Sequence, residues 1–242
     1  MMNSPFNEDL IKNKPKRTKV LPTFIPDELK SFIQCVCWKW EWDMKRGKWT
    51  KPPYNARTRY YASSTNRSTW SSFNDAYAAY EENMEFDGIG FVPTANDPYV
   101  MIDLDHCVDP TNGHIEPWAK EIVDLIDSYT ELTPSGAGLR IIIRGKLPDR
   151  GRKVGNIEVY DKGHYLTLTG HILPFSSGKI IDAQSKLDTF LQKYIKNGKE
   201  HEETHKAQQD STSILSDMEV LDKASSAKNG DKFTQLMDGD IS

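Results

Sequence analysis

The chain has 242 residues, enough for one large or two small domains, and its 37% hydrophobic and 27% charged residues are typical of a soluble globular protein. No apolar run is long enough to span a membrane and the first 20 residues are polar and basic, so we expect a cytoplasmic protein without a signal peptide or membrane partner. The 3 cysteines form no CxxC pair, which argues against a zinc knuckle and a disulfide framework.

The net charge of -4 is unevenly distributed along the chain. Residues 44–74 contain no acidic side chain, and their basic residues alternate with tryptophan and tyrosine; a second basic stretch covers residues 140–153. Runs of this kind are usually solvated surface, but cations mixed with aromatic rings also suit phosphates and stacked bases. The sequence therefore leaves open both a plain solvated surface and an interface for nucleic acid or nucleotides.

The first elements in chain order are predicted from local patterns. Residues 1–20 are expected to form a flexible basic arm, and a short helix is predicted from Pro26. Residues 35–42 alternate with period two, which predicts a strand whose tryptophans belong to the core. A helix is predicted from Ser68 to about Tyr80, where apolar residues follow helical spacing.

Two short apolar segments, residues 88–92 and 99–104, predict strands that pair as a hairpin. Asp103 and Asp105 end the second strand and project from one face, about 7 Å apart. Because neighbouring carboxylates repel, we expect a cation between them, and hard oxygen donors favour Mg²⁺ or Mn²⁺ over zinc. The alternative is a strand end at which an aspartate caps a turn.

A second amphipathic helix is predicted over residues 115–127, followed by four strands at 129–132, 139–143, 157–160 and 165–168, and a last helix at 182–195. The first two of these strands are joined by the turn Thr133-Pro134-Ser135-Gly136-Ala137-Gly138-Leu139-Arg140. Glycines let the backbone approach a ligand, and free amides of a tight turn can form an anion-binding nest. A plain hairpin turn is the alternative.

Residues 156–170 are predicted to form a β-hairpin with its turn near Lys162 and Gly163. Ile157 and Val159 would then face the core, which leaves Glu158 on the opposite face. An acid in such a strand needs a partner. This partner is either a metal shared with the two aspartates or an ion pair with Arg140 or Arg144.

The ordered motifs resemble the phage- and plasmid-type primase-polymerases of the archaeo-eukaryotic primase superfamily, over about residues 35–171. The resemblance rests on MIDLDHCVD, SYTELTPSGAGLRIIIRG and IEVYDKGHYLTLTG, preceded by KWTKPPYNARTRYYASSTNRSTWSSFNDA. It implies an α+β fold, in which an RRM-like antiparallel or mixed sheet carries the acids and joins an N-terminal α/β unit.

The same resemblance implies roles for individual residues. The catalytic, metal-binding carboxylates would be Asp103, Asp105 and Glu158. The residues against the nucleotide would be Ser135, Gly136, Gly138, Arg140, His164 and Thr167. The DNA or substrate cleft would be lined by Lys51, Tyr54, Arg57 and Arg144.

Two positions depart from the family pattern. Many relatives carry His where this chain has Arg140, and Arg is often found where it has His164. Arginine is permanently charged and forks onto phosphate oxygens, so we predict that Arg140 binds the triphosphate. The change puts in doubt any role that needs a titratable imidazole at that position.

The function implied is template-dependent nucleotidyl transfer, as a DNA primase and polymerase in the replication of a phage, plasmid or other mobile element. Its partners would be a single-stranded DNA template and nucleoside triphosphates, and its cofactor Mg²⁺ or Mn²⁺. Two alternatives stay open: a metal-dependent nuclease, and a non-catalytic DNA-binding replication module that is a truncated relic.

The predicted domains are the arm over 1–20, the catalytic domain over 21–196 and a polar linker over 197–228. Residues 229–242 resemble the start of the helical domain that follows the catalytic core in longer relatives. No Walker A motif is present, so we expect no ATPase activity, and a helicase would act as a further domain or a partner.

Overall fold

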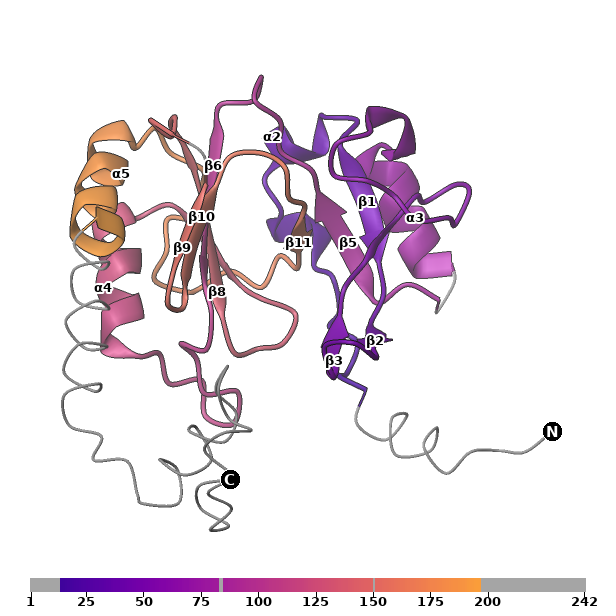
Figure 1. The fold of residues 1–242 in the computed structure, drawn as a ribbon, viewed down its shortest axis with the longest axis horizontal. Helices are drawn as coiled ribbons and strands as arrows, with labels where there is room; N and C mark the ends of the chain where they lie inside the picture. The colour runs from indigo at the N-terminus through magenta and orange to yellow at the C-terminus, as the bar shows by residue number, and fades with distance from the viewer. Residues whose placement is uncertain (1–13, 83–84, 150, 197–242) are drawn as a thin grey trace, which may run out of the picture. The chain divides into compact units, whose positions relative to one another are not determined.

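The computed structural model describes residues 14–82, 85–149 and 151–196, which belong to one compact unit (Figure 1). The predicted linker and the start of a helical domain lie outside the described residues. Within these residues, no helix combines the length and the apolar character that crossing a bilayer requires. The described part of the chain folds into two larger antiparallel sheets with helices against them.

The helical segments are η1 (Pro22–Phe24), α2 (Asp27–Lys30), η2 (Arg67–Thr69), α3 (Phe73–Glu82), α4 (Pro117–Ile126), α5 (Gln184–Phe190) and the π-helical turn η3 (Leu191–Lys196). The strands are β1 (Cys35–Trp38), β2 (Glu41–Asp43), β3 (Lys48–Thr50), β4 (Pro53–Tyr54), β5 (Gly88–Phe91), β6 (Tyr99–Leu104), β7 (Tyr129–Leu132), β8 (Leu139–Arg144), β9 (Arg152–Val154), β10 (Ile157–Tyr160) and β11 (Leu166–Leu168).

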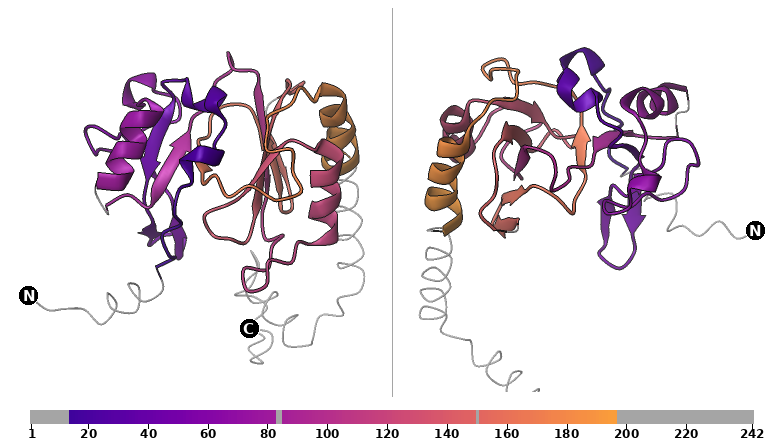
Figure 2. Two further views of the ribbon diagram at one scale, coloured as in Figure 1. Left: turned by 180° about the vertical axis from the view of Figure 1, so that it is seen from behind. Right: turned by 90° about the horizontal axis from the view of Figure 1, so that it is seen from above.

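The first sheet has the strand order β7-β8-β6-β10-β9, and every neighbouring pair is antiparallel. Alternate residues of β6, such as Val100 and Ile102, face the cluster that contains Ile122 and Ile126 of α4 and Leu187 of α5. Figures 1 and 2 show both helices side by side against this sheet. Full burial of such side chains stabilises the fold by about 1.5–3 kcal/mol each, so the helices close one face of the sheet.

The second sheet has the order β11-β5-β1-β4 and is also antiparallel, and α3 packs on β1 and β5. Its apolar residues share one core cluster with Met101 and Ile142, which lie on the face of the first sheet opposite α4. The fold is therefore α+β, as predicted. The expected N-terminal α/β unit is instead all-antiparallel and takes its edge strand β11 from much later in the chain.

Both predicted hairpins are wrong. β5 and β6 lie in different sheets, since β6 is paired on one side by β8 and on the other by β10. β10 and β11 also separate: Val159 packs in the cluster under α4, whereas Leu166 and Leu168 pack in the cluster that both sheets share. Because their apolar side chains are buried in different clusters, the segment 161–165 crosses from one sheet to the other.

The predicted strand over residues 35–42 is interrupted after Trp38. The chain then forms the small β2–β3 hairpin, where Trp42 packs edge-on against Trp49 with ring centroids 5.7 Å apart. Trp38 and Trp40 are buried, which confirms the prediction for these two tryptophans, whereas Trp42 is only partly buried.

Residues 14–20 are the described part of the predicted basic arm, and they contact the folded body. The guanidinium of Arg17 lies 3.9 Å from the centroid of the Tyr80 ring and donates to the Tyr80 carbonyl. Val20 is buried in the core cluster, and the amide of Leu21 donates to the carbonyl of Thr169. This segment is therefore tied to α3 and to the residue that follows β11.

Candidate functional site

A row of five charged residues crosses the whole five-stranded sheet, one on each strand. The strand register places Glu131 opposite Arg140, Arg140 opposite Asp103, Asp103 opposite Glu158, and Glu158 opposite Lys153. Directly opposite residues of an antiparallel pair share a face. The row therefore lies on the face that α4 and α5 leave uncovered, and two of the three predicted catalytic acids stand at its centre.

Asp103 is held by the guanidinium of Arg140 and by the hydroxyl of Tyr160. Arg140 Nε lies 2.7 Å from Oδ1 and Nη2 lies 3.2 Å from Oδ2, which also accepts from Tyr160 at 3.0 Å. Arg140 Nη1 donates to the carbonyl and hydroxyl oxygens of Thr167 on β11. The arginine thus joins the two sheets and uses its donors within the protein.

The pKa values of this cluster follow from its burial and pairing. Burial alone would lower the pKa of Arg140, but the carboxylate of Asp103 outweighs that effect and raises it above the ordinary value. Burial and then the charge of Asp103 raise the pKa of the Tyr160 hydroxyl far above its usual range. Tyr160 therefore stays protonated and donates to Asp103.

Asp105 and Glu158 share one cation, the ammonium of Lys153. Lys153 Nζ lies 3.1 Å from Asp105 Oδ2 and 3.4 Å from Glu158 Oε2. Partial burial acts to lower the pKa of Lys153, but its hydrogen bond to Asp105 and the charges of both acids raise it overall. The cation predicted between Asp103 and Asp105 is not seen as such: Asp103 pairs with Arg140, and Lys153 lies between Asp105 and Glu158.

The donor chemistry of these acids fits a divalent cation, with one restriction. Carboxylate oxygens are the ligands that Mg²⁺ and Mn²⁺ prefer, and Lys153 already occupies a cation position between Asp105 and Glu158. Across the described part of the chain, however, no three acidic, histidine or cysteine side chains are gathered closely enough to hold a metal ion. Asp103 is paired instead with Arg140 and Tyr160.

The glycine turn packs directly against the chain that follows the acids. A Cβ atom on Gly138 would lie 2.7 Å from the carbonyl oxygen of Leu104, and the carbonyl of Ala137 accepts from the amide of Cys107 at 2.9 Å. Gly136 has φ +70°, where glycine is favoured. Ser135 Oγ lies 3.1 Å from the hydroxyl of Thr133 and accepts from the amide of Ala137. The structure therefore packs the glycine turn against Leu104 and Cys107, the residues that flank Asp105 and His106 in the chain.

Lys51 is the predicted cleft residue whose charge acts on this site. Burial and then the positive charge of Arg140 lower the pKa of Lys51 to about 8, while Asp103 and Asp105 act to raise it. Its ammonium lies 4.5 Å from the centroid of the Trp40 ring, and the Tyr165 hydroxyl donates to its carbonyl. Lys51 therefore loses its proton more readily than an ordinary lysine. When protonated, its charge interacts with Asp103 and Asp105.

The other predicted cleft residues have their contacts elsewhere. Tyr54 is buried and donates to Glu41, and Arg57 is exposed and pairs with Asp75 at 2.7 Å. Arg144 pairs with Glu28 at 2.7 Å, and it lies four residues from Arg140 on β8, about 13 Å along the strand. The structure does not bring these three side chains to the acids.

His164 lies in a pocket of about 400 Å³ beside Glu158, in the segment that crosses between the sheets. Its ring centroid is 5.1 Å from that of Tyr160. The same pocket is lined by three further basic side chains, those of Arg152, Lys153 and Lys162. With His164, these side chains make a basic hollow next to Glu158.

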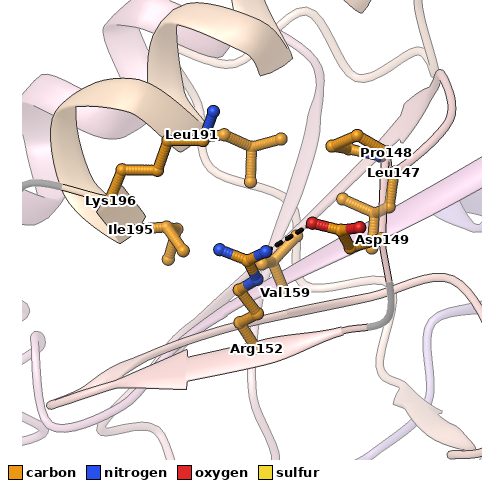
Figure 3. Close-up of a pocket in the computed structure, with 8 residues that line it drawn as sticks. All are labelled: Leu147, Pro148, Asp149, Arg152, Val159, Leu191, Ile195 and Lys196. Atoms are coloured by element: carbon orange, nitrogen blue, oxygen red, sulfur yellow. Dashed lines mark hydrogen bonds and ion pairs between the residues drawn. The ribbon is translucent and has the colours of Figure 1, made fainter. Parts of the chain in front are cut away.

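A smaller hollow of about 20 Å³ lies on the other side of β10, against η3 (Figure 3). It is lined mainly by apolar side chains, among them Leu147, Val159 and Ile195, while Arg152 bonds to Asp149 at its edge. A volume of this size holds about one water molecule. Val159 alternates with Glu158 along β10 and packs in the cluster under α4, so it points away from the acids. This hollow is part of the core.

Three residues of the site were missed in the sequence. Lys153 lies on β9, a strand that was not predicted, and no role was predicted for Tyr160. Glu131 is fully buried and accepts from the Tyr129 hydroxyl and from the amides of Thr169 and Gly170. Burial raises the pKa of Glu131, and the charge of Arg140 opposes this. An acidic residue inside an otherwise apolar strand was the one available signal for Glu131 on β7. It was used to predict a role for Glu158 alone.

The comparison with known proteins agrees with the resemblance seen in the motifs. No protein-family model matches the chain. The chain is 39% identical over 153 residues to the DNA Primase-polymerase of Nitratiruptor phage NrS-1, an alignment that covers 60% of this chain and 20% of the relative. The resemblance to phage-type primase-polymerases is confirmed by this match, and the chain spans about a fifth of the length of that relative.

Proposed function

We propose that this chain, which is similar to a phage DNA primase-polymerase, transfers nucleotides from nucleoside triphosphates to a strand paired with a single-stranded DNA template. This activity would serve the replication of a phage, plasmid or other mobile element. The observation that carries the proposal is the register of β6 and β10, which puts Glu158 opposite Asp103, with Asp105 and the glycine turn adjacent.

Asp103, Asp105 and Glu158 are proposed as the ligands of Mg²⁺ or Mn²⁺. The bound metals would supply activation of a 3′-hydroxyl and charge stabilisation of the leaving oxygen. Lys153 would have to leave the position between Asp105 and Glu158, and the pocket beside Glu158 has room for its ammonium. The protein's own part is to position the carboxylates and to neutralise charge.

For the nucleotide, Ser135, Gly136 and Gly138 are proposed to contact the triphosphate through hydroxyl and amide donors, with Thr167 and His164 nearby. Arg140 was expected to bind the same phosphates. Its contacts support first a positioning role, because it holds Asp103 and reaches β11. Binding of phosphate by Arg140 would require it to release Asp103, which is consistent with Asp103 becoming a metal ligand at that step.

A second candidate is the non-catalytic DNA-binding module. The observation in its favour is that each of the three acids already has an internal cation, Arg140 or Lys153. In such a module the row of charged residues would only stabilise the sheet.

We also propose that a helicase acts together with this chain, as a further domain or as a partner protein.

The test is incorporation of labelled nucleotides on single-stranded DNA, with and without a primer, in Mg²⁺ and in Mn²⁺. Wild type is compared with the double variant Asp103→Asn/Asp105→Asn. We expect a metal-dependent product that the double variant does not make. If neither protein extends DNA while both bind it equally, the non-catalytic module is the better description; degradation of the DNA would indicate the nuclease.

A further inference from the structure

A second groove, the Arg67 groove, lies apart from the acids. It has a volume of about 290 Å³ and is lined by residues of segments 64–70 and 93–95 and by Lys162 and Gly163 of the crossing segment. Lys162 also lines the pocket beside Glu158. The two hollows therefore meet at one lysine, on the segment that connects β10 to β11.

The charges of the Arg67 groove suit a polyanion. None of the described residues that line it is acidic, whereas Arg67 and Lys162 are basic and exposed. The structure describes no carboxylate partner for either side chain; Arg67 Nη2 lies 3.4 Å from Thr94 Oγ1, and its guanidinium lies 5.9 Å from the centroid of the Trp70 ring. Arg57 and Arg144, by contrast, are both neutralised by acids.

The groove also offers hydroxyl groups on a fixed frame. Ser64 Oγ donates to the carbonyl of Gly163 at 2.9 Å, which ties one wall of the groove to the crossing segment. Trp70 is buried and its indole Nε1 donates to the carbonyl of Ser63 at 2.7 Å, so it forms a rigid floor. Thr65 and Thr94 add two further hydroxyls. Because hydrogen bonds already hold Ser64 and Trp70 in place, these side chains lose little conformational freedom when a ligand binds.

We propose that the Arg67 groove binds the sugar-phosphate backbone of single-stranded nucleic acid and leads it past Lys162 toward Glu158. Arginine, lysine, serine and threonine side chains are the usual partners of phosphate oxygens, and such contacts set the position of a strand without reading its sequence. The proposal rests on the proposed function in one respect: the strand is the template or primer of the transfer reaction.

The test is the affinity of the full 242-residue chain for fluorescein-labelled oligo(dT), measured by anisotropy over a series of salt concentrations without nucleotide. Arg67→Ala and Lys162→Ala are each expected to weaken binding roughly three- to tenfold and to lower the salt slope by about 0.7, as expected for one lost phosphate contact on a single strand. The matched control is Lys120→Ala, an exposed lysine on α4 paired with Asp124, which is expected to bind like wild type.

Wild-type affinity and salt slope in both groove variants would overturn the proposal, and so would loss of binding in Lys120→Ala alone. Absence of any oligo(dT) binding by the wild type would overturn it as well. Because the assay needs no metal or nucleotide, these outcomes are independent of the incorporation assay. A chain that binds oligo(dT) through the groove but transfers no nucleotide would keep this proposal and remove the proposed catalysis.

Discussion

The guanidinium of Arg140 contacts both carboxylate oxygens of Asp103, with Nε 2.7 Å from Oδ1 and Nη2 3.2 Å from Oδ2. The side chains are only 8% and 16% exposed, so the pair lies largely out of water. The same guanidinium reaches Thr167 on the second sheet. One ion pair therefore both positions a proposed metal ligand and holds the two sheets together.

Replacing Arg140 by Ala is expected to destabilise the protein by about 3–5 kcal/mol, because Asp103 would be left as an unpaired buried charge. Urea unfolding followed by fluorescence measures the change. The control is Arg57→Ala, whose partner Asp75 is exposed, and it is expected to cost about 0–1 kcal/mol. Equal losses in the two variants would contradict the assigned role of Arg140.

Replacing Lys153 by Met is expected to strengthen Mn²⁺ binding several-fold, because it removes the ammonium that competes for Asp105 and Glu158. Isothermal titration with Mn²⁺ measures the affinity directly. Lys120→Met is the matched control, since Lys120 pairs with Asp124 on α4, and it is expected to leave the affinity unchanged. Weaker Mn²⁺ binding in Lys153→Met would show that the lysine does not stand in for the metal.

Replacing Gly138 by Ala is expected to destabilise the glycine turn by about 1–3 kcal/mol, because the new Cβ would lie 2.7 Å from the carbonyl oxygen of Leu104. Thermal unfolding measures the loss. Gly163→Ala is the comparison: Gly163 has φ +79° but nothing within 4 Å of the added Cβ, so backbone strain of about 1 kcal/mol is its only cost. A Gly138→Ala variant as stable as wild type would mean that the turn moves freely away from Leu104.

The pKa of Lys51, lowered to about 8 by burial and by Arg140, makes stability depend on pH. Between about pH 8 and the ordinary lysine value near 10.4, the unfolded chain binds more protons at this position than the folded chain. The contribution of Lys51 to the free energy of unfolding is therefore expected to rise over this range. The measurement is the difference in unfolding free energy between wild type and Lys51→Met from pH 7 to 11, and a constant difference would contradict the shifted pKa.

Local pattern in the sequence determined a large part of the secondary structure. The helix predicted over 115–127 is α4 (Pro117–Ile126), and the strands predicted at 129–132 and 157–160 have the same bounds in the structure. These segments were predictable because the spacing of apolar residues indicates whether an element is a helix or a strand and which of its faces is buried. The motif residues Asp103, Asp105 and Glu158 were identified in the same way, on strand β6, just after it, and on β10.

Only the tertiary structure decided which elements are neighbours. Both predicted hairpins failed because periodicity encodes a buried face and not the strand that pairs with it, and β10 and β11 bury their apolar sides in different clusters. The same limit hid the contacts of the site. Lys153 reaches the acids from the unpredicted strand β9, and Arg140 turns to Asp103 because the register of β6 and β8 places them opposite each other. The sequence determined which residue types are present and which face of each helix or strand is buried. Long-range strand pairing determined which charged side chains contact one another.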